Sequence, residues 1–334
     1  MSARASAAAV RANLARFRTH QRMVDKWGEP MVAAAASYLA ELQGSERFLS
    51  LALPALQEAL APLDPLGQNR PRLECFLGLP EARPGTPLHL AEVMQSRLGG
   101  QVPLARIQVF ARGHAAGLMA LAEACQRLRH GEGLCMVGGV DTYLQPEALE
   151  WLDAQGLFKS PSQRWGFIPG EAASFCLLAS EAAVKRHGLR TLGRILSVSV
   201  AHEERTRRAG GICLGEGLTR ALSGALEALA PGRKVDQVIG DLNGERYRTD
   251  EYGFSLNRLS ERFTDGSRIR TPADCWGDVG AASGPLFLIL SAISAMRGYA
   301  PGPLALVWTS AEGGERAAAL LELPIKPGGR APWR

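Results

Sequence analysis

The sequence predicts an α/β protein in which helices cover the sheets. Short apolar segments typical of buried strands alternate along the chain with segments whose apolar residues recur at helical spacing. This alternation occurs before and after about residue 190, which indicates two similar halves, residues 1–190 and 191–334. The composition agrees, because 46% of the 334 residues are hydrophobic and 21% are charged, the balance of a globular protein rather than a disordered one.

The first half should open with helices and continue with strands joined by helices. The long helix that starts near His114 is amphipathic, and Pro80 ends the first buried strand. The expected elements are, in order, helices at 4–19, 30–42 and 50–62, a strand at 73–79, a helix at 87–98, a strand at 107–110, a helix from 114 to 129, strands at 134–137 and 175–179, and a helix at 181–187.

The second half repeats this pattern on a smaller scale. Its segment 285–297 is apolar on all sides, which is typical of a buried helix. The expected elements are, in order, a strand at 191–200, a helix at 216–229, a strand at 235–241, helices at 251–260 and 285–297, and a strand at 303–309.

The charge pattern does not favour nucleic-acid binding. The formal net charge is +5, yet no long run of Lys and Arg occurs, and the densest stretches are 205–208 and 258–270. Such stretches are typical of a solvated surface, with docking of an acidic partner or substrate as the alternative. No segment is apolar for long enough to cross a membrane, and the N-terminus lacks the apolar core of a signal peptide.

The six cysteines indicate buried, reduced thiols in a cytoplasmic protein. No two of them have a CxxC spacing, which makes a zinc site an unlikely use for them. Most lie in apolar stretches, such as Leu134–Val137 around Cys135. No metal and no other cofactor is expected.

Five motifs occur in an order that is familiar from one family. An elbow at His114 leads into a long helix and then a strand that ends in Gly138 and Gly139. The other motifs are GFIPGEAA at 166–173, DLNGE at 241–245, WGDVGAASG at 276–284 and EGGER at 312–316. Together they resemble the β-ketoacyl-acyl carrier protein synthases, whose corresponding motifs are the nucleophile elbow, GFVxGEGA, EAHGT, IGHTEAAAG and FGGTN.

The resemblance implies a thiolase-like fold with five layers, αβαβα, and a site between two similar halves. The family opens with a strand, whereas this chain opens with a helix, so the first strand is expected to be missing from it, either because it is lost or because the true start lies upstream. The resemblance also implies acyl carrier protein or coenzyme A thioesters as partners. Family dimers pair through the strand at 107–110, so we expect a homodimer or a heterodimer with an active synthase.

Every reactive position of the family has changed in this chain. The catalytic cysteine corresponds to His114, the first histidine to Asn243 and the second to Asp278. The lysine that usually precedes the second histidine corresponds to Ala273, and the gatekeeping phenylalanine to Glu312. A cysteine at a helix N-terminus has a lowered pKa and carries the acyl group as a thioester, which a neutral imidazole does poorly. Ordinary Claisen condensation is therefore not expected.

The replacing residues leave two interpretations open. The helix dipole should favour neutral His114, whereas a nearby Asp278 would favour the imidazolium. The two could form an acid–base couple, or they could be a relic in which Asp278 pairs with His114 or with Arg316. Asn243 precedes a glycine and could be only a turn residue.

The neighbouring positions are expected to shape or support the site. Glu245, Trp276 and Glu312 are candidate binding residues; Trp276 should fill part of the acyl channel. Glu245 could instead be solvated or paired with Arg246 or Arg248. Glu171, Gly138 and Gly139 should be structural residues near the site. Cys275 could be a relocated nucleophile but is expected to be an inert thiol, and nothing in the spacing supports a metal held by His114, Asp278 and Glu245.

Three functions follow from these replacements. The first is a non-catalytic partner, similar to a chain-length factor, in fatty acid or polyketide-type biosynthesis. The second is an acyltransferase, decarboxylase or hydrolase that acts on acyl thioesters through His114 and Asp278. The third is a protein that binds acyl chains without catalysis.

Overall fold

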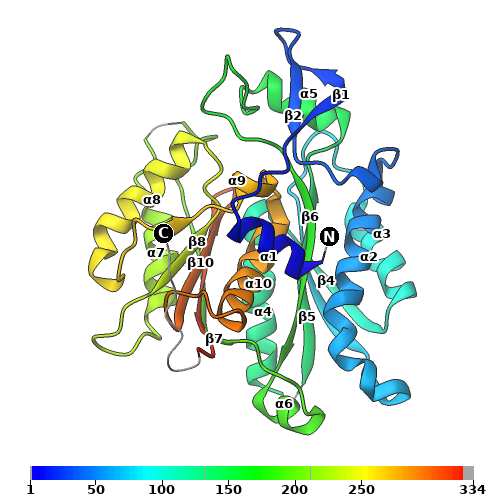
Figure 1. Cartoon of the computed structure of the whole chain (residues 1–334), viewed down its shortest axis with the longest axis vertical. Coiled ribbons are helices and arrows are strands. Elements are labelled where there is room, and N and C mark those ends of the chain that lie inside the picture. The colour runs from blue at the N-terminus through cyan, green and yellow to red at the C-terminus, as the bar shows by residue number, and fades with distance from the viewer. Residues whose placement is uncertain (1, 132, 211, 326–334) are drawn as a thin grey trace.

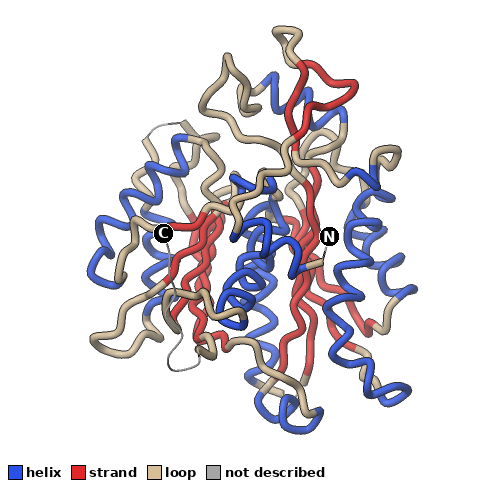
Figure 2. Tube along the Cα trace, in the orientation of Figure 1, coloured by secondary structure: helices blue, strands red, loops and turns tan. Residues whose placement is uncertain are grey.

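Two β-sheets form the body of the protein, with helices between them and on both outer faces (Figures 1 and 2). The computed structural model describes residues 2–131, 133–210 and 212–325. The outer helices are α2 (Gly44–Leu60) and α3 (Leu90–Gln101) on one side, and α7 (Glu216–Leu226) and α8 (Arg246–Leu259) on the other. The central helices are α4 (Ala116–Arg129) and α10 (Ser283–Met296). The predicted arrangement of five α/β layers is confirmed.

The first sheet has four strands in the order β4-β3-β5-β6, and the second has five in the order β7-β11-β10-β8-β9. The strands of the first sheet are β3 (Leu73–Leu79), β4 (Leu104–Ala111), β5 (Leu134–Thr142) and β6 (Glu171–Ala179). The strands of the second are β7 (Arg194–His202), β8 (Gln237–Gly240), β9 (Ile269–Arg270), β10 (Leu304–Ser310) and β11 (Glu315–Glu322).

The two sheets follow one plan. In the first, β3 is parallel to β4 and β5, while β6 is antiparallel to β5. In the second, β8 is parallel to β9 and β10, while β11 is antiparallel to β10. The sheets differ at one edge. In the second sheet β7 pairs with the outer edge of β11, whereas no strand of the described ranges pairs with the outer edge of β6 in the first sheet. This matches the expectation that the first strand is missing from the first half.

The sequence explains why these elements lie in the core. Strand β10 is buried along its whole length, as its nearly continuous apolar sequence requires. Helix α10 is apolar all round because it lies between the two sheets and packs against α4, β6 and β10. Most predicted elements of the core agree to within a few residues, and α6 (Glu181–His187) has the predicted bounds. The predicted helices at 50–62 and 251–260 begin earlier, at Gly44 and Arg246.

The prediction was wrong at the N-terminus. Helix α1 (Ala3–Arg11) is shorter than the predicted helix at 4–19, because the chain leaves it at Asn13, whose φ is +51°. Strand β1 (Arg18–Val24) then pairs with β2 (Pro30–Ala33), where a helix at 30–42 was expected. The run of alanines after Val32 has helical propensity, but burial of Met31 and Ala33 in a small separate core favours the hairpin instead.

Several further elements were not predicted, among them α5 (Pro146–Ala154), β11, β9 and the short helix α9 (Ala273–Trp276). Helix α5 packs in the same small core as β2, at the end of the molecule that carries the hairpin (Figure 1). Strand β11 lies in the middle of the second sheet, although its alanines and leucines do not alternate as a strand pattern would. Among the described residues, no helix is both long and apolar enough to cross a membrane.

Candidate functional site

The site lies where two matching elbows meet at the ends of α4 and α10. Each helix is preceded by one turn of 3₁₀ helix, Gly113–Ala115 before α4 and Gly280–Ala282 before α10. Both turns open on a glycine with positive φ, +56° and +49°, which other residues rarely adopt. The sequences Gly-His-Ala-Ala-Gly from residue 113 and Gly-Ala-Ala-Ser-Gly from residue 280 therefore play the same structural part.

The two central helices approach each other closely at the last glycine of each elbow. A Cβ atom on Gly117 would lie 2.4 Å from Cδ of Pro285, and one on Gly284 would lie 2.8 Å from Cγ of Leu118. Both distances are shorter than a carbon–carbon contact allows, so these positions need glycine. This close approach brings His114 of the first half towards Asp278 of the second.

His114 and Asp278 form a buried pair. Nε2 of His114 lies 2.8 Å from Oδ1 and 2.9 Å from Oδ2 of Asp278, and both residues are less than 5% exposed. The backbone N–H of Gly280 also donates to Asp278, at 2.8 Å. Asp278 is therefore the partner of His114 and not of Arg316, whose Nε donates to Glu251 instead.

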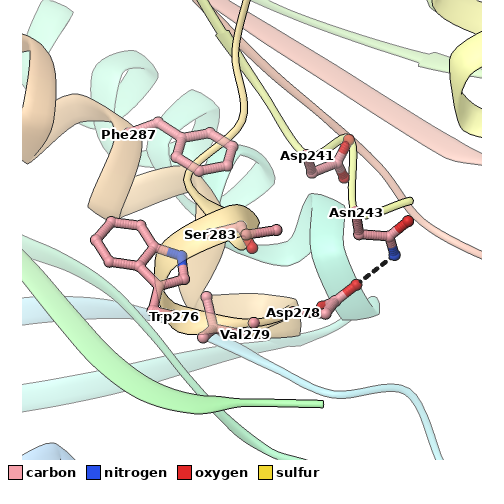
Figure 3. A pocket seen from close by; sticks show the side chains of 9 residues that line it. Asp241, Asn243, Trp276, Asp278, Val279, Ser283 and Phe287 are labelled. Carbon is pink, nitrogen blue, oxygen red and sulfur yellow. Dashed lines mark hydrogen bonds between the residues drawn. The ribbon is translucent and has the colours of Figure 1, made fainter. Parts of the chain in front are cut away.

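Asn243 joins this pair from the loop after β8. Its Nδ2 donates to Oδ2 of Asp278 at 2.6 Å (dashed line in Figure 3) and to Oε2 of Glu245 at 3.0 Å. Its Oδ1 accepts from the backbone N–H of Glu245, so Asn243 is also a turn residue, before Gly244 with φ of +105°. The structure thus brings together the three positions that the resemblance matches to the family's Cys-His-His.

Arg248 connects the rest of the site, and the sequence analysis did not assign it there. Its guanidinium donates to Glu245 at 2.9 Å, to Asp241 at 3.1 Å and to Glu312 at 3.3 Å, and the residue is 1% exposed. Of the two arginines proposed for Glu245, Arg248 is the partner, three residues further on in α8. A spacing of three residues places both side chains on one face of a helix, and this spacing was the feature of the sequence that could have identified the pair.

Glu312, which the resemblance matches to the family's gatekeeping phenylalanine, ends the network. It accepts from Arg207 at 3.0 Å and from the hydroxyl of Tyr247. Although burial raises its pKa, the charges of Arg248 and Arg207 outweigh that effect and lower the pKa to about 2. A charged, paired side chain thus occupies the place of an apolar one.

Each member of the central pair favours the charged form of the other. Burial opposes the charge on His114, but Asp278 beside it raises the pKa of the imidazole overall. Burial likewise opposes the charge on Asp278, but His114 and then Arg248 lower the pKa of that carboxyl. In its protonated form, a His114 imidazole paired with Asp278 is neither a nucleophile nor a free general base.

Little free space remains beside these residues. The cavity lined by Asp241, Asn243 and Asp278 on one side and by Trp276 and Phe287 on the other measures about 10 Å³ (Figure 3). That is about the room that one water molecule needs. Oδ1 of Asp241 has no hydrogen-bond partner, and burial raises the pKa of this carboxyl. Trp276 lines the cavity, where we expected it to fill part of an acyl channel.

The residues expected to support the site lie in a second buried network. Both oxygens of Glu171 accept from Arg47, at 2.7 and 2.8 Å, and Glu171 also accepts from Thr142 and from the backbone N–H of Ala36. Gly139 borders the second elbow, since a Cβ there would lie 2.0 Å from the carbonyl oxygen of Ala281. A Cβ on Gly138 would overlap the ring of Phe175.

The cysteines lie apart from the network. Burial raises the pKa of Cys275, and its thiol donates to Oδ1 of Asn13 near the end of α1. In the described part of the chain, the ligand atoms of Glu203, Cys213 and Glu251 lie within 4.8 Å of one another. Glu251 is already paired with Arg316, and burial is the first cause that raises the pKa of Cys213 to about 11. The three side chains therefore have partners within the protein and do not need a metal ion to compensate them.

Comparisons with known proteins agree with this geometry. Residues 113–183, from the first elbow to the start of α6, match the β-ketoacyl synthase N-terminal domain family. A chain of AntDE:AntF, a type II PKS acyl-carrier protein in complex with its ketosynthase, superposes with a TM-score of 0.78 over 97% of this chain and 95% of its own, at 12% identity. The chain has the β-ketoacyl synthase fold.

Two other solved structures with the β-ketoacyl synthase fold are similar to this chain. The ketosynthase from module 6 of the bacillaene synthase of Bacillus subtilis 168 has a TM-score of 0.76 at 17% identity, covering 97% of this chain and 70% of its own. The ishigamide ketosynthase/chain length factor has a TM-score of 0.70 at 18% identity, covering 97% and 95%. No curated protein sequence matches the chain.

Proposed function

We propose that this ketosynthase-like chain is a non-condensing partner, similar to a chain-length factor, that works beside an active ketosynthase in fatty acid or polyketide-type biosynthesis. One observation carries the proposal: the three positions of the catalytic set hold His114, Asn243 and Asp278, and these residues are bonded to one another. No thiol of the described residues occupies the elbow, so the acyl-enzyme step lacks its nucleophile.

The filled cavity supports the same conclusion. Condensation needs room for an acyl chain and for the donor thioester, and about 10 Å³ does not provide it. The charges of Arg248 and Glu312 are already compensated, so an apolar chain entering here would separate buried ion pairs. This also counts against a protein that binds acyl chains at this position.

The edge of the first sheet is a suitable surface for a partner. Strand β4 pairs only with β3 among the described strands, and Ala105 and Arg106 on it are exposed. An unpaired edge strand can add a strand of another chain. The family resemblance implies pairing at this strand, and one solved structure with the same fold is a ketosynthase/chain length factor.

The alternative is an enzyme that acts on acyl thioesters through His114 and Asp278. The distance of 2.8 Å between Nε2 and Oδ1 is that of an acid–base couple, which favours this second candidate. It requires the site to open, because the pair is buried. The enzyme would then transfer or hydrolyse acyl groups, or decarboxylate a malonyl thioester, without an acyl-cysteine intermediate.

Association with a ketosynthase tests the proposal. We expect a ketosynthase with the complete Cys-His-His set to be encoded beside this chain and to co-elute with it on a size-exclusion column. Arg106→Glu on β4 should weaken the complex, whereas Arg190→Glu, an exposed arginine outside β4, should not. An isolated gene, or two proteins that elute separately, would count against the partner role.

The variant His114→Cys separates loss of the nucleophile from loss of the cavity. It restores the thiol at the elbow but leaves Asp278 and the Arg248 network around it. We expect no covalent labelling by acetyl or malonyl thioesters, because the cavity beside the elbow measures only about 10 Å³. Labelling comparable to that of a ketosynthase would mean that the cavity opens in solution.

A further inference from the structure

Four arginines gather where α1 crosses the end of α10, away from the His114 network. Arg4 and Arg11 lie on one face of α1, on either side of Ala7, which is buried against the core next to α10 (Figure 1). Arg297 directly follows α10, and Arg270 ends β9.

The cluster is organised around Tyr299. The guanidinium carbon of Arg11 lies 4.5 Å from the centre of the tyrosine ring, and that of Arg270 lies 5.8 Å from it. Tyr299 is 6% exposed, so the ring is a rigid platform for these charges. The pKa of Arg270 is lowered, first by burial and also by the nearby charge of Arg11, as expected where like charges meet.

An open cavity of about 180 Å³ adjoins the cluster. It is lined by Arg4 and Arg297 with Met296 between them. This is far more than the roughly 10–15 Å³ that a single water needs. Among the described residues, no carboxylate lies within ion-pair distance of Arg4, Arg11 or Arg297. A positive charge near the C-terminal carbonyls of α10 is favourable, which explains Arg297 at this helix end but not the arginines on α1.

We propose that this cluster is a binding site for a phosphate-bearing ligand. One phosphate group would lie in the cavity between the guanidinium groups of Arg4 and Arg297, which are suited to bidentate contacts with phosphate oxygens. A second phosphate, as in a diphosphate, would extend towards Arg11 beside Tyr299. The proposal does not depend on the function proposed for the chain.

Titration calorimetry with sodium pyrophosphate tests the site. The wild-type protein should bind one equivalent. Arg297→Gln and Arg4→Gln should each weaken binding by about fivefold or more, because each removes a charge-assisted contact. Arg190→Gln is the matched control: it removes an exposed arginine elsewhere and should leave the affinity unchanged. All three residues lie on the surface, so the variants should fold.

Two further ligands identify the source of the phosphate. Competition by coenzyme A would mean that the site accepts a nucleotide diphosphate, whereas binding of pyrophosphate and inorganic phosphate without such competition would mean that it takes free anions. The proposal is overturned if pyrophosphate at up to about 10 mM gives no saturable heat. A dissociation constant above that concentration corresponds to a binding free energy too small for a specific site. It is equally overturned if Arg4→Gln/Arg297→Gln binds as the wild type does, or if Arg190→Gln loses as much.

Discussion

The two elbows of the molecule share one backbone geometry but carry different chemistry. The elbow of the first half presents His114 after its positive-φ glycine, and that of the second half presents Ala281. The second half supplies Asp278 and Asn243 instead, so the imidazole comes from one half, and the carboxylate that pairs with it and the amide that donates to this carboxylate come from the other. The comparison teaches that the duplicated scaffold, set by glycines and close packing, is kept independently of the reactive groups placed on it.

The largest effect is expected from Arg248→Met. Arg248 neutralises Asp241, Glu245 and Glu312 in the second half, and its loss leaves these carboxylates buried without their cation. The free energy of unfolding should fall by about 3–5 kcal/mol, measured by urea denaturation. Arg246→Met is the control, because this neighbouring arginine is exposed and should change stability by less than about 1 kcal/mol. Equal effects would mean that the network does not hold the site together.

Removing the charge of His114 should reduce stability in a pH-dependent way. The folded-state pKa of His114 is raised, so its contribution is fully present below the unfolded value of about 6.5 and is lost as the pH rises through the folded value. His114→Gln should therefore cost about 1–3 kcal/mol near neutral pH and less in alkaline solution. Urea denaturation at several pH values checks this. A cost independent of pH would mean that His114 is neutral in the folded protein.

Gly117→Ala should show how much the close approach of the elbows matters. The added Cβ would meet Pro285 of α10, so we expect a loss of about 1–3 kcal/mol and a lower Tm. Gly253 lies at an exposed position of α8, where an added Cβ would have no neighbour within 4 Å. Gly253→Ala should therefore stabilise the protein by about 0.5–1 kcal/mol. If both substitutions stabilise, the central helices tolerate a wider separation than the structure indicates.

The smallest effect is expected from Arg208→Gln. This side chain pairs with Glu81 at 2.9 Å and links the two halves at the surface, where its own side chain is 46% exposed. Because solvent screens such a pair, stability should change by about 0–1 kcal/mol and less at high salt. Thermal unfolding at two salt concentrations measures it. A loss as large as that of Arg248→Met would contradict the view that buried ion pairs contribute more to stability than surface pairs do.

The sequence predicted the fold well where one pattern dominates. Helices α4 and α10 have long, regular apolar patterns, and the glycine motifs locate the elbows and hence His114, Asn243 and Asp278. The hairpin β1–β2 was missed because its alanines favour a helix locally, while its stability depends on Tyr143 and Phe167, more than a hundred residues away in the chain. Strand β11 was missed because a strand buried on both faces has no alternation.

Arg248 shows which part of the site could not be predicted from the sequence. In the sequence it is one of several arginines in a polar helix, and such residues are usually exposed. Asp241 and Glu245 lie in the loop just before it, but only the folded chain brings Glu312 to the same guanidinium. The replaced catalytic positions could thus be found from their motifs, and the sequence offered Arg248 as one of two partners for Glu245, whereas its pairing with Asp241 and Glu312 could not be predicted.

The most direct test is an assay with radiolabelled acetyl, malonyl and longer acyl thioesters, carried on coenzyme A and on acyl carrier protein. Covalent labelling, carbon dioxide release and free thiol are followed, with His114→Ala and Asp278→Ala as comparison variants. We expect no labelling and no turnover from a folded protein. Turnover that both substitutions abolish would contradict the account, and would make His114 and Asp278 the catalytic pair of an acyl-thioester enzyme.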